Sequence, residues 1–167
     1  MASCADAYKP FDEGDGDIPT AKGSPATVGN AEFSGTLNSI SLEGQGWTQA
    51  QVDAMVTPNP FTLVIEDNKV GCSYITPPKQ LLCPDSSNPN VVEASYEEEI
   101  AEEGGGKSIF SAYIKITLDN AANPTTAKVE YHLKFYSSAY AADQRYSDTF
   151  IAVYEGTLNK KVASSGG

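Results

Sequence analysis

Apolar and polar residues alternate along the second half of the chain. Within residues 108–118 the even positions from Phe110 onward are apolar, and within residues 128–135 the odd positions are apolar instead. A period of two points successive side chains to opposite faces of a strand, so each segment is expected to have one buried and one wet face. Residues 149–158 carry apolar side chains on both sides, including Ile151 and Val153. This pattern predicts a third strand that is covered on both faces.

The first half of the chain contains further strand signals. Residues 61–66 and 70–75 flank Asp67-Asn68-Lys69, and this predicts a hairpin because Asp and Asn tolerate a positive φ. The alternation in residues 33–42 changes phase near Asn38-Ser39, which predicts a bulge there. A weaker strand candidate covers residues 90–96.

These segments together predict an all-β fold. Seven or eight strands joined by short connections indicate a single antiparallel β-sandwich or β-barrel, and the two architectures stay open as alternatives. One recurrence bears on the choice, because Gly35-Thr36-Leu37-Asn38 in the first strand returns as Gly156-Thr157-Leu158-Asn159 in the last. A barrel would pair those two strands, whereas a sandwich need not.

One short helix is expected near residues 48–56. Thr48 and Gln51 have the spacing of a capping box, and Val52, Met55 and Val56 form an apolar stripe. Pro58 ends the pattern. Trp47 precedes the cap and is interpreted as a core residue that fastens this turn to the sheet.

The distribution of glycine, proline and acidic residues suggests the domain organisation. Residues 1–29 are interpreted as a flexible acidic tether, since such a composition buries too little apolar surface to offset the entropy of ordering. The β-domain is then residues 30–162, and residues 163–167 form a disordered tail. The glutamates between Glu93 and Glu103 precede three glycines, and this stretch is expected to be a solvated excursion between strands.

The charge balance limits the possible partners. Twenty-two Asp and Glu against eleven Lys and Arg give a net charge of −11 over 167 residues. A nucleic-acid surface needs clustered Lys and Arg, and an anionic membrane surface attracts basic segments, so both partners are disfavoured. No stretch approaches the ~20 apolar residues of a spanning helix.

Three cysteines raise the questions of redox state and anchoring. Cys72 and Cys83 lie eleven positions apart and are predicted to form a disulfide, with buried free thiols as the alternative. A metal site is not expected, because zinc takes four ligands and the chain has a single histidine, His132. The third cysteine follows Met1-Ala2-Ser3, and this opening resembles the end of a bacterial lipoprotein signal. The resemblance implies lipid attachment at Cys4 and a location in the cell envelope, at the outer membrane or the cell surface.

Catalytic chemistry is not expected. Nucleophilic catalysis by Ser or Cys needs a nearby base, and His132 falls on the polar face of its strand, where a surface histidine is the simpler interpretation. No phosphate-binding loop, dinucleotide fingerprint or Gly-x-Ser-x-Gly motif occurs, and no cofactor is predicted. Carboxylates are frequent enough that a glycoside hydrolase stays an alternative, although no pair stands out.

Binding is therefore the predicted function. Tyr and Arg are common anchors of recognition surfaces, and four of them gather in or beside residues 137–148, namely Tyr136, Tyr140, Arg145 and Tyr146. We expect this loop to recognise a protein or a glycan at one end of the β-domain. The alternative within the binding class is a carrier that holds a small hydrophobic ligand in a barrel lumen.

Overall fold

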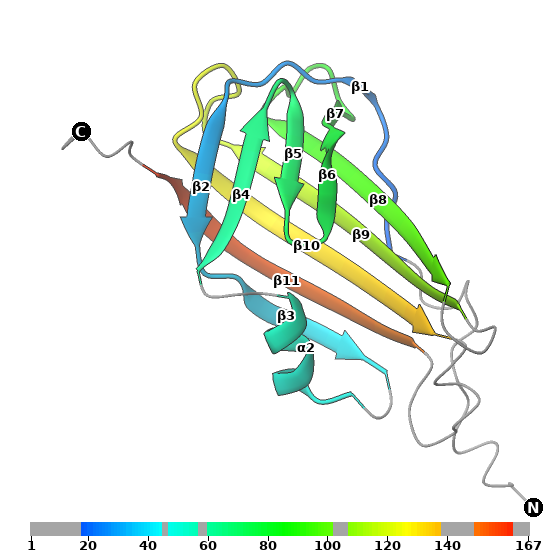
Figure 1. Cartoon of the computed structure of the whole chain (residues 1–167). Coiled ribbons are helices and arrows are strands. Elements are labelled where there is room, and N and C mark those ends of the chain that lie inside the picture. The colour runs from blue at the N-terminus through cyan, green and yellow to red at the C-terminus, as the bar shows by residue number, and fades with distance from the viewer. Residues whose placement is uncertain (1–17, 45–46, 57–59, 102–106, 138–148, 162–167) are drawn as a thin grey trace, which may run out of the picture.

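A computed structural model describes residues 18–44, 47–56, 60–101, 107–137 and 149–161 (Figure 1). These ranges contain one helix and eleven strands, which confirms the all-β class. The helix is α2 (Gln49–Val56). The strands are β1 (Ser24–Pro25), β2 (Ala31–Gly35), β3 (Asn38–Glu43), β4 (Phe61–Glu66), β5 (Lys69–Cys72), β6 (Ile75–Gln80), β7 (Leu82–Cys83), β8 (Val91–Ala101), β9 (Lys107–Leu118), β10 (Thr126–Ser137) and β11 (Thr149–Lys160).

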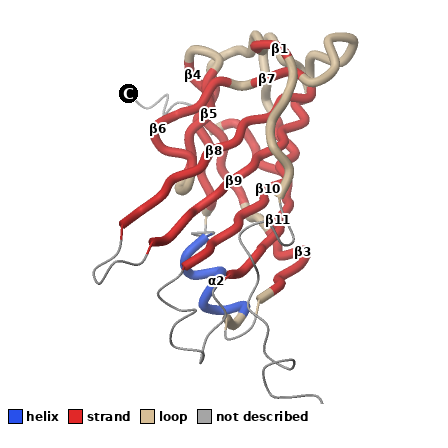
Figure 2. The backbone as a smooth tube through the Cα atoms, turned by 90° about the vertical axis from the view of Figure 1, so that its right-hand side faces the viewer, coloured by secondary structure: helices blue, strands red, loops and turns tan. Residues whose placement is uncertain are grey.

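All strands belong to one antiparallel sheet that curls into a nearly closed barrel. Its order is β1-β7-β8-β9-β10-β11-β2-β4-β5-β6, and β3 pairs with β11 beside this path. Strand β6 lies close to β8, so the sheet returns toward its own beginning. Figure 2 shows the curled strands from the side. Of the two architectures that the sequence left open, the barrel is the one observed.

The long strands follow the predicted alternation. In the register of β9, β10 and β11, Ile114, Tyr131 and Tyr154 stand side by side and are almost completely buried. Side chains one position along point outward, as the period of two requires. On β11 the outward Ile151 is also buried and Val153 is half-buried. This agrees with the expectation that the last strand is covered on both faces.

The recurring tetrapeptides meet where the first and last strands pair. Strand β11 pairs with β2 through Asn159 and Ser34, and with β3 through Glu155 and Asn38. The pairing of β3 with β11 shifts register beside Ile40, next to the predicted bulge at Asn38-Ser39. A side chain in place of Gly156 would collide with the chain at the bend between β2 and β3. Glycine is therefore needed for this close approach.

The turn between β4 and β5 and the helix α2 form where the local sequence predicted them. Asp67 and Asn68 have φ values of 53° and 63°, which makes a tight two-residue hairpin between β4 and β5. The Thr48 hydroxyl accepts a hydrogen bond from the Gln51 amide (3.1 Å), and the Gln51 side chain accepts one from the Thr48 amide (2.9 Å). This reciprocal pair is the predicted capping box, and it begins α2.

Two expectations about acidic and N-terminal segments were wrong. Glu93, Glu97, Glu98 and Glu99 are not in a loop, because they belong to β8, which runs to Ala101 and pairs with β9 along its whole length. Glu102 and Glu103 lie outside the described residues. The tether boundary at residue 29 is too late, since Ala26 and Val28 are buried in the core and β1 pairs with β7. Residues 1–17 and 162–167 lie outside the described residues.

Candidate functional site

The strands differ in length, and this difference leaves part of the inner sheet face without a second layer. Strands β8 to β11 have 11 or 12 residues, whereas β2, β4, β5 and β6 have 4 to 6. At roughly 3.3 Å per residue the long strands extend about 36–40 Å and the short ones about 13–20 Å. The short strands therefore close only one end of the barrel (Figure 1).

The helix α2 covers the inner face of β10 and β11 beyond the short strands. Val52 and Val56 are completely buried, and the Tyr154 hydroxyl donates a hydrogen bond to Asp53 Oδ1 (2.6 Å). Trp47 packs against Phe135 and Phe150, with ring centroids 5.8 and 5.1 Å apart. The predicted role of Trp47 as a core residue is confirmed.

A pocket of about 390 Å³ lies over β8 and β9, beside the part that α2 covers. Its most distinctive feature is four aromatic rings from three strands and one turn, with a carboxylate at its edge. Tyr74 stacks on Phe110 with centroids 4.6 Å apart and nearly parallel planes, and Phe135 lies 5.3 Å from Phe110. The lining residues are Ser73, Tyr74, Thr76, Tyr96, Glu98, Ser108, Phe110 and Phe135.

The position of Tyr74 links the pocket wall to the helix. Its hydroxyl donates a hydrogen bond to the Met55 carbonyl (2.5 Å), and the Ser73 hydroxyl donates one to the Val56 carbonyl (3.3 Å). These bonds satisfy carbonyls at the end of α2, which have no partner within the helix. The turn after β5 is thereby fixed, and one wall of the pocket is preformed.

The pocket has a negative edge. Glu98 is exposed, and among the described residues that line the pocket it is the only charged one. Desolvation raises the pKa of the Tyr96 hydroxyl, and the charge of Glu98 and its hydrogen bond with that hydroxyl raise it further. The Lys79 ammonium lies 4.7 Å from the Tyr96 ring centroid, a cation–π contact on β6 next to the pocket.

The closed end of the barrel is filled with side chains. Ile114, Tyr131 and Leu133 are fully buried, and the Phe61 ring lies 5.4 Å from that of Tyr131. Space for a ligand therefore occurs at the open end, where Phe110 and Phe135 are only partly buried. A second hollow of about 420 Å³ lies over β4, β5 and β6, and none of the described residues that line it is charged. Ser73 and Thr76 line both spaces, so the aromatic pocket is distinguished by its four rings and by the carboxylate of Glu98.

Of the predicted recognition residues, Tyr136 is described, and it does not line the pocket. Tyr136 alternates with Phe135, so it lies on the outward side of β10, where it is half-buried. Tyr140, Arg145 and Tyr146 lie outside the described residues. Sequence reasoning did not propose Tyr74 or Tyr96 as site residues, and alternation placed Phe110 and Phe135 on the apolar face of their strands without showing where the facing layer ends.

The predicted disulfide between Cys72 and Cys83 is not formed, and both residues are free thiols. Cys72 pairs with Ile75, the first residue of β6. Cys83 lies in β7, beyond the last residue of β6. The six residues of β6 extend roughly 20 Å, whereas a disulfide requires Cα atoms within about 7 Å. Burial raises the pKa of the Cys72 thiol, whose sulfur lies 3.7 Å from the Tyr131 hydroxyl. Cys4 lies outside the described residues.

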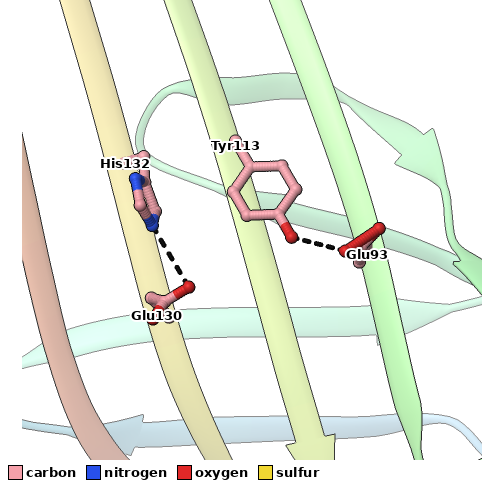
Figure 3. A network of polar contacts seen from close by, with 4 residues as sticks. All are labelled: Glu93, Tyr113, Glu130 and His132. Carbon is pink, nitrogen blue, oxygen red and sulfur yellow. Dashed lines mark hydrogen bonds and ion pairs between the residues drawn. The ribbon is translucent and has the colours of Figure 1, made fainter. Parts of the chain in front are cut away.

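A polar network occupies the outward face of β8, β9 and β10 (Figure 3). Tyr113 donates a hydrogen bond to Glu93 (2.5 Å), and His132 Nε2 lies 3.2 Å from Glu130 Oε2. The Tyr113 and His132 rings meet edge to face. Burial raises the pKa of Tyr113, and the hydrogen bond and charge of Glu93 add to this effect. The contacts of His132 in Figure 3 are to a ring and a carboxylate, which suits a structural role.

Comparisons of the chain with family models, curated proteins and solved structures return no match. Among the described residues, no helix is long and apolar enough to cross a membrane. The same part of the chain holds no group of three His, Cys, Asp or Glu side chains placed to bind a metal ion.

Proposed function

We propose that this chain is a non-enzymatic binding protein that receives an apolar or aromatic group of its ligand in the pocket at the open end of the barrel. The observation that carries the proposal is the gathering of Tyr74, Tyr96, Phe110 and Phe135 around about 390 Å³ of space. Small-molecule sites are typically about 300–1,000 Å³, mostly apolar, and supplied with a few polar groups. The pocket meets all three criteria, since Glu98, Ser73, Thr76 and Ser108 supply the polar groups.

The two binding alternatives from the sequence differ in where the ligand sits. A carrier with a ligand in a closed lumen has little support, because Tyr131 and Leu133 fill the closed end. Recognition at one end of the domain has more support, because the pocket lies at the open end. Recognition by Tyr136, Tyr140, Arg145 and Tyr146 and anchoring through Cys4 stay predictions.

Trp47 provides a built-in reporter for this proposal. It is the only tryptophan of the chain, and its ring touches that of Phe135, which lines the pocket. We would titrate the full chain with N-phenyl-1-naphthylamine, a neutral apolar fluorophore that accepts energy from tryptophan. Binding in the pocket should give saturable energy transfer with a stoichiometry of one.

Two variants and one control locate the bound fluorophore. Tyr96→Ala removes a half-buried wall of the pocket, and Phe110→Leu removes a stacked ring while keeping apolar volume. Each should weaken binding about three- to tenfold, since an aromatic contact is worth about 0.5–1.5 kcal/mol beyond its buried area. Tyr136→Ala removes a ring from the outward side of β10 and should leave binding unchanged. The proposal fails if the fluorophore does not saturate, or if only Tyr136→Ala weakens its binding.

A further inference from the structure

We infer that the group held in the aromatic pocket is a methylated or quaternary ammonium. This inference rests on the proposed function and adds the chemical class of the ligand. Its basis is a juxtaposition of four aromatic rings with the carboxylate of Glu98, in a pocket whose described lining residues include no Lys or Arg. The faces of aromatic rings attract cations, and quaternary ammonium ligands are recognised by cages of such rings.

One ring at this site already holds an ammonium group. Lys79 Nζ lies 4.7 Å from the centroid of Tyr96, within the distance of about 6 Å at which a cation–π contact is effective. Lys79 comes from β6, and it does not line the pocket. The contact indicates that the electrostatic environment of this ring suits a cation.

The charge of the site favours a cation over an anion or a neutral ligand. Glu98 stands at the edge of the pocket, and the neighbouring Glu97 and Glu99 are exposed on the same strand. The whole chain has a net charge of −11. An anionic ligand would be repelled, while an approaching cation would be attracted over the range of the screening length, about 8 Å at physiological salt.

Methylation matters because of the four rings. A primary ammonium has three N–H donors, and it loses strong hydration when it enters an aromatic pocket. A trimethylammonium group has an apolar surface with its positive charge spread over the methyl groups, so it can contact an aromatic lining with less loss of hydration. The pocket therefore suits the methylated cation better than the side chain of an unmodified lysine.

The test compares choline with 3,3-dimethylbutan-1-ol, a neutral molecule of nearly the same shape. Both would be titrated into the ¹⁵N-labelled full chain, and dissociation constants would be taken from the amide shifts of β8 and β9. Choline is expected to bind at least about fivefold more tightly than the alcohol, the size of a partly solvated cation–π contact. The preference should fall as salt is added, because screening weakens attraction between exposed charges.

Substitutions that change a charge should affect the binding of choline and not the binding of the neutral alcohol, a difference that a merely apolar pocket would not show. Glu98→Gln should weaken choline binding about three- to tenfold, and Lys79→Gln should strengthen it by a smaller factor, because the first removes an attractive charge and the second a repulsive one. Both should change binding of the alcohol by less than about twofold. Glu99→Gln is the matched control, since it changes the same charge on the outward side of the same strand.

The outcomes separate this inference from the proposed function. If the alcohol binds as tightly as choline, or if Glu98→Gln and Glu99→Gln act alike, the ammonium class is wrong. The same holds if neither compound binds while N-phenyl-1-naphthylamine does, and in that case the proposed pocket still stands. If none of the three ligands binds, both proposals fall. Circular dichroism of each variant checks that the exposed substitutions leave the sheet folded.

Discussion

Replacing Gly156 by alanine tests the packing that closes the barrel between its first and last strands. A Cβ at this position would lie 2.2 Å from the Thr36 carbonyl oxygen and 3.2 Å from the Leu37 Cα. Ordinary contact begins near 3.4 Å, so the backbone of one strand has to move by about 1 Å. The obstacle is backbone, which cannot rotate away as the end of a flexible side chain can.

The magnitude follows from two opposing terms. Overpacking costs about 1–3 kcal/mol, and a backbone obstacle places this site in the upper part of that range. Alanine restricts the unfolded chain more than glycine does, which returns about 0.4–1 kcal/mol. We therefore expect Gly156→Ala to lower the free energy of unfolding by about 2 kcal/mol.

Urea denaturation followed by Trp47 fluorescence and circular dichroism measures this change. With an m-value of about 2 kcal/mol/M, the midpoint should fall by about 1 M.

Two other glycines provide a graded series of controls. At Gly35 a Cβ would lie 2.9 Å from a Leu158 methyl group and 3.1 Å from the Thr157 carbonyl oxygen. At Gly71 the only atom closer than 3.4 Å would be one carbon of the Pro78 ring, at 3.3 Å. The loss should decrease from Gly156→Ala to Gly35→Ala, and Gly71→Ala should stay within about 0.5 kcal/mol of the wild type. Equal stability of Gly156→Ala and Gly71→Ala would refute the reasoning.

Two further predictions concern acid and thiol chemistry. Hydrogen bonds from the Thr125 hydroxyl and from the Thr126 and Thr125 amides hold the pKa of Asp119 well below its ordinary value of 3.8. A lowered folded-state pKa contributes stability above pH ~4 that is lost as the pH falls through the folded-state value. The wild type should therefore lose more stability than Asp119→Ala between pH 6 and pH 3 in urea melts, and parallel losses would contradict this. At pH 8 iodoacetamide should alkylate Cys72 more slowly than Cys83, because burial protects the Cys72 thiol and raises its pKa. Peptide mass spectrometry measures both rates, and equal rates or a two-hydrogen deficit would show that the thiol assignment is wrong.

Local patterns in the sequence predicted the elements well because their causes are local. The alternation on β9 and β10 arises because one face of each strand is buried and the other is more exposed to solvent. The positive φ angles of Asp67 and Asn68 are tolerated well by Asp and Asn. The capping box of Thr48 and Gln51 involves residues three apart. The same reasoning covered only part of β8, since it predicted a weak strand over residues 90–96 and a loop around the glutamates that follow. The inward side of β8 carries Tyr96 and Glu98, and alternation fades beyond them because no second layer covers that half of the strand.

The candidate site was largely beyond the reach of such patterns. Tyr74 and Phe110 stack although 36 residues of chain separate them, and a turn tied to α2 brings them together. The disulfide prediction failed for a related reason, since the spacing of Cys72 and Cys83 says nothing about the full strand that keeps them apart.

The sequence by itself determined the strands with clear alternation such as β9, β10 and β11, the buried side of each of them, the hairpin turn at Asp67-Asn68 and the start of the helix, since these depend on contacts a few residues long. Only the tertiary structure decided that the sheet curls into a barrel, that β11 meets β2 and β3, and that an aromatic pocket with Glu98 stays uncovered. The physical reason is that the pocket exists through a mismatch in length between strands that pair across the whole chain. No local sequence pattern shows where the short strands that face β8 to β11 end.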